Sequence, residues 1–283
     1  MAADMATWFI TGTSSGFGRH LAELLLERGG RVAATTRKIG ALDDLGRRYG
    51  DRLWKAALDV TDTAEVKRVV GRAFEDLGRI DVVVSNAGYN LVGGAEEVSD
   101  EQFMHLLTTN LIGSIQVARA ALPRLRAQGG GRILQLSSMS GQAAFPGGSY
   151  YAAGKWGIEG FFEALAAEVR PFNIQVTLVE PGSAKTNIFH SGTVMGDKLP
   201  AYDNTPADLA RRYVASGQVA QPGDPVKMAS AMITCAEAPD APLRLVLGKD
   251  AYACIRAALT GRMAALEEQK GLACSTDFDS DVS

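Results

Sequence analysis

The chain has 283 residues, of which 46% are apolar and 22% charged, a composition typical of an ordinary globular protein and sufficient for one large domain. Lys and Arg number 29 against 32 Asp and Glu, so the net charge of -3 leaves no basic surplus to neutralise nucleic acid or an anionic membrane. These values exclude collagen-like, disordered and disulfide-scaffold proteins, and they argue against nucleic-acid and membrane partners.

Short apolar or β-branched runs alternate along the chain with longer segments of helical periodicity. The runs predict seven strands, at residues 8–11, 31–36, 53–58, 81–85, 132–137, 174–179 and 243–247. The intervals predict helices, at residues 16–28, 41–49, 63–77, 100–127, 151–170, 224–236 and 250–269. Because strands and helices alternate, we expect an α/β fold with a doubly wound, seven-stranded parallel sheet and helices on both faces.

One segment, residues 186–222, interrupts this alternation. It is polar, punctuated by Gly and Pro, and too long for a simple connection, so it predicts a lid or binding loop that contains a short helix. In an open parallel sheet the ligand lies beyond the carboxyl ends of the strands, where the strand-to-helix loops converge. We expect residues 1–274 to form a single domain, and the polar, acidic end at 275–283 to be disordered.

The three cysteines, Cys235, Cys254 and Cys274, are odd in number and have no CxxC spacing, which is typical of a reducing compartment. The first residues lack the basic and apolar regions of a signal peptide, and no apolar run approaches the roughly 18 residues that cross a bilayer. We therefore expect a cytoplasmic protein.

A glycine-rich turn lies between the first predicted strand and the first predicted helix, at Thr11-Gly12-Thr13-Ser14-Ser15-Gly16-Phe17-Gly18. Glycines there allow a tight turn, allow backbone N–H groups to approach a pyrophosphate, and direct a helix N-terminus at its charge. The alternative is a turn with no ligand. Because the glycines stand between strand and helix, the motif predicts a dinucleotide site.

The end of the second strand bears on the choice of cofactor. A carboxylate there would bind the ribose 2′-hydroxyl of NAD and repel a 2′-phosphate, but the sequence Ala33-Ala34-Thr35-Thr36-Arg37-Lys38 has no acid. Arg37 offers a forked cation to a phosphate, which favours NADP(H). A solvated surface arginine is the alternative reading, and NAD(H) then remains the second choice.

Tyr151 and Lys155 lie four residues apart on a predicted helix, so their side chains share one face. Transfer of a hydride to a carbonyl requires a proton at the oxygen, and a nearby ammonium lowers a phenol's ordinary pKa of about 10 toward the range useful for that task. Tyr150 is followed four residues later by Gly154, so only Tyr151 has this partner. Ser138 follows the fifth strand and could hold the substrate oxygen, whereas strand alternation turns Ser137 to the other side.

Together these motifs resemble the short-chain dehydrogenase/reductase family. Its TGxxxGxG signature matches Thr11 to Gly18, its Asn-Ala-Gly matches residues 86–88, and its YxxxK matches Tyr151 to Lys155, with the serine 13 residues upstream at Ser138. The resemblance extends over residues 7–247, and Ser85, where the family usually has Asn, is a conservative departure. It implies a Rossmann-like fold and an NADP(H)-dependent oxidoreductase.

The resemblance also implies roles for individual residues. Asn110 would hold a water that links the lysine to solvent, Asp59 would bind the adenine amino group unless it only caps a helix, and Thr186 would contact the carboxamide and phosphates unless it is a plain turn hydroxyl. The implied catalytic residues are Asn110, Ser138, Tyr151 and Lys155. The implied cofactor-binding residues are Gly12, Ser14, Ser15, Gly16, Phe17, Gly18, Arg37, Asp59, Val60, Asn86, Ala87, Gly88, Tyr151, Lys155, Pro181, Gly182 and Thr186.

The expected reaction interconverts an apolar ketone and its secondary alcohol, because the residues expected to wall the crevice are apolar or small: Leu91, Val92, Met139, Phe145, Val179 and the lid at 186–222. The alternatives are an NAD-preferring alcohol dehydrogenase of the same family and a regulator that senses the dinucleotide without turnover. No metal is expected, since His20, His105 and His190 are scattered. The family implies a homodimer or homotetramer.

Overall fold

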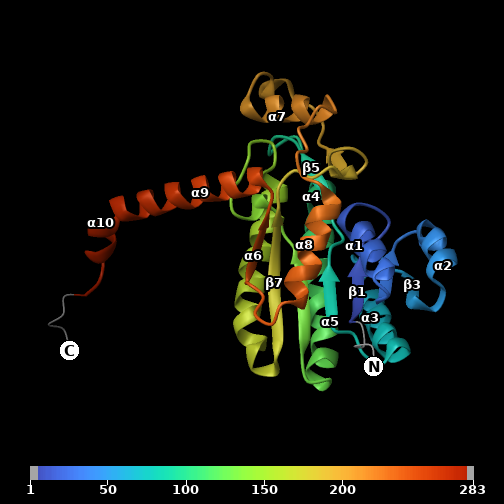
Figure 1. Ribbon diagram of the computed structural model, residues 1–283. Helices are drawn as coiled ribbons and strands as arrows, with labels where there is room; N and C mark the ends of the chain where they lie inside the picture. Colours follow the sequence, from blue (N-terminus) through green and yellow to red (C-terminus); the bar gives the residue numbers. More distant parts are fainter. Residues whose placement is uncertain (1–5, 279–283) are drawn as a thin grey trace.

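The computed structural model describes residues 6–278 and contains one parallel sheet of seven strands, with the order β3-β2-β1-β4-β6-β7-β9 (Figure 1). Its strands are β1 (Thr7–Thr11), β2 (Arg31–Thr36), β3 (Leu53–Ala57), β4 (Val82–Ser85), β6 (Gly131–Leu136), β7 (Ile174–Pro181) and β9 (Arg244–Leu247). The expected doubly wound α/β fold is confirmed. Chain order reverses between β1 and β4, which opens a crevice at that end of the sheet.

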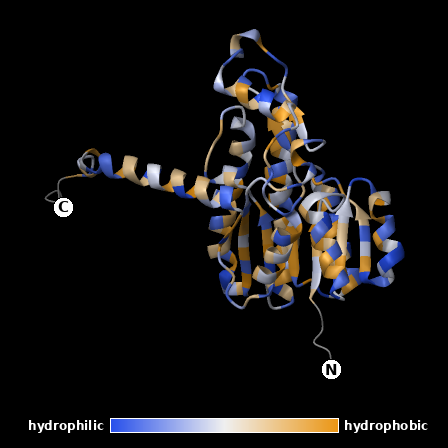
Figure 2. Ribbon diagram, turned by 45° about the horizontal axis from the view of Figure 1, so that its top comes forward, coloured by the Kyte–Doolittle hydropathy of each residue, from blue (hydrophilic) through white to orange (hydrophobic). Residues whose placement is uncertain are grey.

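Helices cover both faces because each strand alternates its side chains. On β1, Trp8 and Ile10 face a core shared with α1 (Gly16–Glu27), α2 (Asp43–Tyr49) and α8 (Pro225–Glu237). Phe9 faces the opposite core, shared with α3 (Thr63–Leu77), α5 (Gly113–Ala127) and α6 (Ser149–Val169). Figure 2 shows hydrophobic residues along the strands between these two helical layers.

The predicted helix 100–127 is instead three elements. A Ser99 capping box starts α4 (Asp100–Leu107), a π-helical turn follows at Thr108–Ile112, and α5 continues from Gly113. The predicted helix 41–49 is likewise divided into a 3₁₀ turn (Ile39–Leu42) and α2. Further 3₁₀ turns lie at Gly50–Arg52, Met139–Gly141, Arg170–Phe172, Asn187–Phe189 and Pro200–Tyr202.

A second, smaller sheet was not predicted. It pairs β5 (Asn90–Val92) in parallel with β8 (Thr193–Met195), and so attaches the segment 186–222 to the body. The same segment contains α7 (Pro206–Ala215), the short helix expected there, which lies above the carboxyl ends of the strands (Figure 1). We call residues 186–222 the lid segment.

The chain ends in α9 (Lys249–Glu268) and α10 (Lys270–Cys274), which extend away from the body (Figure 1). Residues 275–278 form a turn after α10, and the remainder of the expected disordered end, 279–283, lies outside the described residues. Across residues 6–278, no helix combines the length and the apolar character that a membrane span requires.

Candidate functional site

One cavity of about 1210 Å³ lies at the carboxyl ends of the strands, where loops from six strands meet the lid segment. All but two of the residues expected at the site line it. These are Gly12, Ser14, Ser15, Gly16, Phe17, Arg37, Asp59, Val60, Asn86, Ala87, Gly88, Ser138, Tyr151, Lys155, Pro181, Gly182 and Thr186. Gly18 and Asn110 do not line it.

The glycine-rich turn is built so that backbone lies against backbone. Gly12 has φ +71°, and a Cβ there would lie 2.9 Å from the Cα of Ala87. A Cβ on Gly18 would lie 2.5 Å from Asn86 Nδ2, which donates to the carbonyl oxygens of Thr11 (2.9 Å) and Gly12 (3.1 Å). Gly18 is therefore needed for close packing rather than for a ligand contact.

The N-terminus of α1 borders the cavity directly after this turn. Ser15 is its N-cap residue and makes no side-chain cap hydrogen bond, and Gly16 has φ +59°. Free N–H groups in the first turn of a helix provide a site for an anion. The backbone cradle and the helix end together fit the pyrophosphate of a dinucleotide.

The opposite end of the cavity, after β2 and β3, presents Arg37 and Asp59. Arg37 is exposed, and the residues of β2 beside it, Thr35 and Thr36, bring no acid. Burial raises the pKa of Asp59, but the N–H and hydroxyl of Thr61 and the charge of Arg37 outweigh this effect and leave that pKa below its ordinary value. Asp59 does not cap a helix, because Asp62 caps α3.

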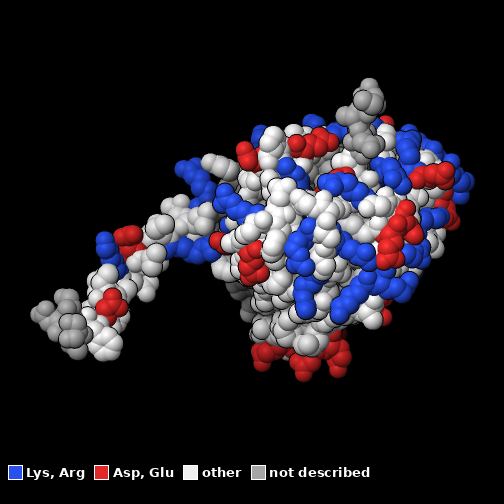
Figure 3. All heavy atoms as spheres, turned by 90° about the horizontal axis from the view of Figure 1, so that it is seen from below, with Lys and Arg blue, Asp and Glu red and all other residues white. Residues whose placement is uncertain are grey.

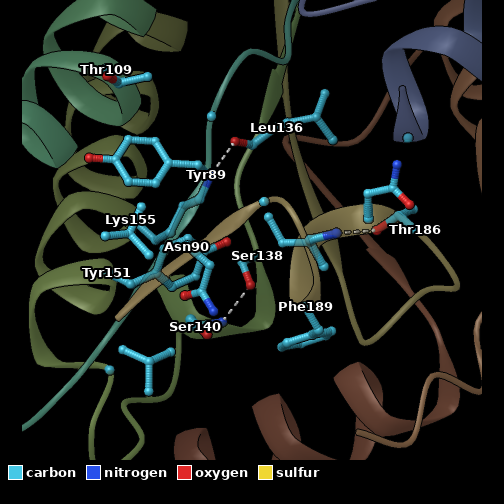
Figure 4. A pocket seen from close by; sticks show the side chains of 18 of the residues that line it. Tyr89, Asn90, Thr109, Leu136, Ser138, Ser140, Tyr151, Lys155, Thr186 and Phe189 are labelled. Carbon is cyan, nitrogen blue, oxygen red and sulfur yellow. Dashed lines mark hydrogen bonds between the residues drawn. The ribbon is translucent and has the colours of Figure 1, made fainter. Parts of the chain in front are cut away.

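The proposed acid/base group stands on α6 beside the end of β6. Lys155 Nζ lies 5.6 Å from the centre of the Tyr151 ring and donates to the Leu136 carbonyl at 2.8 Å. Ser138 begins the 3₁₀ turn after β6, where its Oγ accepts from the Ser140 N–H at 3.1 Å. Figure 4 shows Tyr151 and Lys155 on one side of the cavity and Thr186 on the other, with Ser138 between them.

The neighbouring tyrosine and serine lie differently. The Tyr150 hydroxyl donates to the Ala95 carbonyl at 2.7 Å, and Tyr150 does not line the cavity. Ser137 contributes to the lining, but its hydroxyl lies 2.7 Å from where a Cβ on Gly141 would stand, and it is buried without a partner among the described residues. Tyr151 and Ser138 are thus the pair that the cavity presents.

Burial has the largest effect on the pKa values of Tyr151 and Lys155. It raises the pKa of Tyr151 to about 12, with the Ser138 hydroxyl acting in the opposite direction. It lowers the pKa of Lys155 to about 8, with the Glu159 carboxylate opposing. The net shift of the Tyr151 pKa is therefore upward, opposite to the direction expected from a neighbouring ammonium.

Asn110 lies in the π-helical turn, where it is buried and does not line the cavity. Its Oδ1 accepts from the Tyr89 N–H at 3.0 Å and its Nδ2 donates to the Tyr89 carbonyl at 2.8 Å. Both side-chain groups therefore hold the loop between β4 and β5, which carries Gly88 and Tyr89 to the cavity. This placement makes Asn110 a positioning residue in the structure.

Thr186 closes the cavity from the lid side. Its Oγ1 accepts from the Ile188 N–H at 3.4 Å at the start of a 3₁₀ turn, and its own N–H donates to Gln221 Oε1 at 3.2 Å. The threonine is thus a turn hydroxyl here, and it lines the cavity as well.

The substrate wall differs in part from expectation. Val92, Met139 and Phe145 line the cavity. Leu91 instead packs with Val98 and Leu106, and Val179 is buried in the sheet core, because strand alternation turns them away. The lid segment, also expected at the wall, contributes Ile188, Phe189, Val194, Tyr213 and Val214. Tyr89 lines the cavity as well and was not expected there.

The comparisons agree with this geometry. A family model described as short chain dehydrogenase matches residues 6–194. Oxidoreductase BOA17 of Botryotinia fuckeliana is 38% identical over 86% of this chain and 89% of its own length. The 3-ketodihydrosphingosine reductase of Bacteroides thetaiotaomicron is 37% identical over 62% of this chain and 63% of its own.

A solved short-chain dehydrogenase from Streptomyces avermitilis superposes with a TM-score of 0.90 at 37% identity, covering 98% of this chain and 100% of its own. Fold, motif positions and relatives therefore agree over most of the chain. By these criteria the chain belongs to the short-chain dehydrogenase/reductase family of oxidoreductases.

Proposed function

We propose that the protein is an NADP(H)-dependent oxidoreductase that interconverts an apolar ketone and its secondary alcohol. The observation that carries the proposal is the convergence of Ser138, Tyr151 and Lys155 in the same cavity as the glycine-rich turn and Arg37. A nicotinamide cofactor supplies the hydride acceptor or donor that such an arrangement lacks among its own side chains.

Different residues of the chain would bind different parts of the cofactor. The turn at Gly12 to Phe17 and the N-terminus of α1 would hold the pyrophosphate, and Arg37 would pair with a 2′-phosphate. Asp59 would accept from the adenine amino group, and Lys155 would bind the nicotinamide ribose. Absence of a carboxylate at the end of β2 supports NADP(H) over NAD(H).

Tyr151 would move the proton. In reduction its hydroxyl donates to the developing alkoxide, while the Ser138 hydroxyl donates a hydrogen bond that holds the same oxygen. A tyrosine pKa of about 12 keeps the phenol protonated at neutral pH, which suits the donor role. In the direction of alcohol oxidation the same group must first lose its proton.

The substrate class follows from the wall of the cavity. Val92, Met139, Phe145, Phe189 and Val214 offer an apolar surface next to Ser138 and Tyr151, which supports an uncharged, largely hydrophobic ketone. The 3-ketodihydrosphingosine reductase among the relatives is named for a ketone that carries a long hydrocarbon chain, and this agrees with such a wall.

Replacing Tyr151 by Phe tests the acid/base assignment. The variant removes one hydroxyl from the buried ring, so we expect kcat to fall by about 100-fold or more while NADPH binding, followed by fluorescence titration, stays unchanged. Retention of more than about a tenth of the wild-type rate would contradict the role. Tyr150→Phe is the matched control, because that hydroxyl bonds to Ala95 outside the cavity.

Replacing Arg37 by Asp tests the cofactor preference. The carboxylate would repel a 2′-phosphate and accept from a 2′-hydroxyl, so the ratio of kcat/KM for NADPH to that for NADH should fall by about 100-fold or more. Lys38→Asp makes the same charge change one residue later, where the side chain does not line the cavity. An equal effect of both variants, or a wild type that prefers NADH, would favour the NAD alternative.

A dinucleotide sensor without turnover is the second candidate function. Oxidation of NADPH in the presence of a panel of aromatic and long-chain ketones decides between the two, because a sensor binds NADPH but oxidises none of it.

We also propose a reducing, cytoplasmic location for the oxidoreductase. This proposal rests on the three free cysteines, Cys235, Cys254 and Cys274.

A further inference from the structure

The helices α9 and α10 leave the body soon after they begin. Ala251 and Ile255 are buried against the body, whereas from residue 256 onward the side chains are exposed, except for a half-buried Ala258. We call residues 256–278 the arm. Figure 1 shows α9 extending from the body as a straight rod, with α10 turned away from it at the far end. Arg262 connects the arm to the body. Its guanidinium carbon lies 5.0 Å from the centre of the Trp156 ring, and the group donates a hydrogen bond to Gln142.

The arm carries an apolar stripe along one side. Leu259, Met263 and Leu266 are 51%, 59% and 60% exposed. Spacings of four and three residues place all three on one face of the helix. A helix this long gains most of its stability from packing an apolar face, which the body does not provide here.

We infer that this stripe is covered by the arm of a second copy of the chain, packed antiparallel about a two-fold axis near residue 261. In that register Leu259 of one copy faces Met263 of the other, and the reciprocal contact forms by symmetry. Leu266 then lies level with Arg256 of the second copy, where its arm leaves the body. The two stripes thus overlap over Leu259 and Met263 of each copy.

Charge complementarity selects this orientation. Arg256 and Glu267 are both exposed and lie 11 residues apart, close to three helical turns, so they stand on the same edge of the stripe. The antiparallel register that pairs the apolar residues also brings Arg256 of each copy beside Glu267 of the other. A parallel two-fold pair would place this edge of each copy on opposite sides of the interface, so Arg256 and Glu267 would not meet.

A lipid surface suits the arm less well. Helices that lie on membranes carry cations along the polar face, whereas the flanks of this stripe mix Arg256 and Arg262 with Glu267. Figure 3 shows both signs of charge along the arm. Mixed charge with internal complementarity fits a second arm.

Sedimentation velocity of the full chain tests the apolar contact. Wild type should form an assembly at micromolar concentration, and Met263→Asp should halve its mass or raise its dissociation constant at least tenfold. Ala264→Asp introduces the same carboxylate on the next residue, away from the stripe, and should leave the assembly unchanged. A monomeric wild type, or equal behaviour of the two variants, would overturn the inference.

A charge exchange tests the antiparallel register. Arg256→Glu and Glu267→Arg, each alone, should weaken the assembly by about tenfold, and the double variant should recover it, because each copy then presents the reversed pair. Glu268→Arg, on the far face of the helix, is the matched control. Failure of the double variant to recover would overturn the register. Ketone reduction by NADPH should persist in all of these variants, since the arm lies outside the cavity.

Discussion

Two buried carboxylates lie beyond Lys155, one on the proposed catalytic helix and one on a neighbouring strand. Glu159 on α6 and Glu180 on β7 share Arg244 Nε, at 3.1 and 3.3 Å, and both accept from Gln142 Nε2. Burial, with the neighbouring Glu159 charge, raises the pKa of Glu180 to about 7. Glu180 therefore keeps its proton to a higher pH than an ordinary glutamate, beside a second acid that lies one helical turn beyond Lys155.

This proton makes stability depend on pH. The folded state binds it more tightly than the unfolded chain, whose glutamate has a pKa near 4.5, so the contribution is complete below about pH 4.5 and is lost as the pH rises through about 7. Glu180→Gln keeps the site neutral, and its Tm should exceed that of wild type by about 2–4 °C at pH 8 and by little at pH 5.

Thermal unfolding at the two pH values, followed by circular dichroism, measures this difference. Glu163→Gln is the control, because Glu163 also pairs with Arg244 but is exposed. An equal shift of the Glu180 variant at both pH values would show that the carboxyl carries no buried proton.

At the scale of the residue, the sequence predicted which side chains lie at the site better than it predicted the directions of their pKa shifts. Helical spacing together with the resemblance to the family predicted Tyr151, Lys155 and Ser138, because residues four apart share a helix face and the family's serine stands 13 residues before its tyrosine. The directions of the pKa shifts depend on burial, which arises from loops and the lid segment distant in sequence. Asn110 was expected to hold a water; its side chain binds the backbone of Tyr89, and the role of holding a water stays a prediction.

At the scale of the element, the lid segment is fastened by one buried ion pair. Glu97, after β5, is 3% exposed and accepts from the N–H groups of Gly94 (2.7 Å) and Leu199 (3.0 Å). Arg211 on α7 pairs with it at 2.9 Å and also donates to the Gly196 carbonyl. The helix above the cavity is therefore tied to the body through a desolvated carboxylate.

Arg211→Met should loosen α7 selectively. The variant leaves Glu97 buried without its cation, at a cost of about 2–4 kcal/mol, so hydrogen exchange in α7 should accelerate by about 100-fold while α3 is unaffected. Leu209→Met changes an exposed side chain on the same helix and should have little effect. Similar exchange in both variants would show that the pair does not fasten the helix.

The elements themselves were predicted unevenly. The seven strands and the long helices followed from periodicity, which is strong when an element spans the core. Strands β5 and β8 have three residues each, and their paired residues Asn90 and Thr193 are 103 positions apart in the sequence, so no local pattern predicts them. The π-helical turn at Thr108–Ile112 has ordinary helical periodicity on both sides, and only its contact with Tyr89 distinguishes it.

At the scale of the whole molecule, the parallel sheet explains why one cavity receives so many loops. All seven strands point the same way, so the loops that follow them lie on one side of the sheet. The order of strands reverses between β1 and β4, and this reversal separates the loops on either side. The crevice could be expected from the alternation of strands and helices. The arm's separation from the body could not, since a helical period does not say whether the apolar face finds a partner.

The order of the sheet also bears on how the chain emerges from the ribosome. Strands β1 to β4 form one uninterrupted block, β3-β2-β1-β4, and β6, β7 and β9 add to it outward in the order of synthesis. The first block can pair before any later strand exists, and each later strand can then pair with the edge of a sheet that has already formed. Until β6 arrives, however, the outer edge of β4 has no neighbour. A nascent chain paused after Ser85 therefore exposes an apolar strand edge of the kind that invites aggregation.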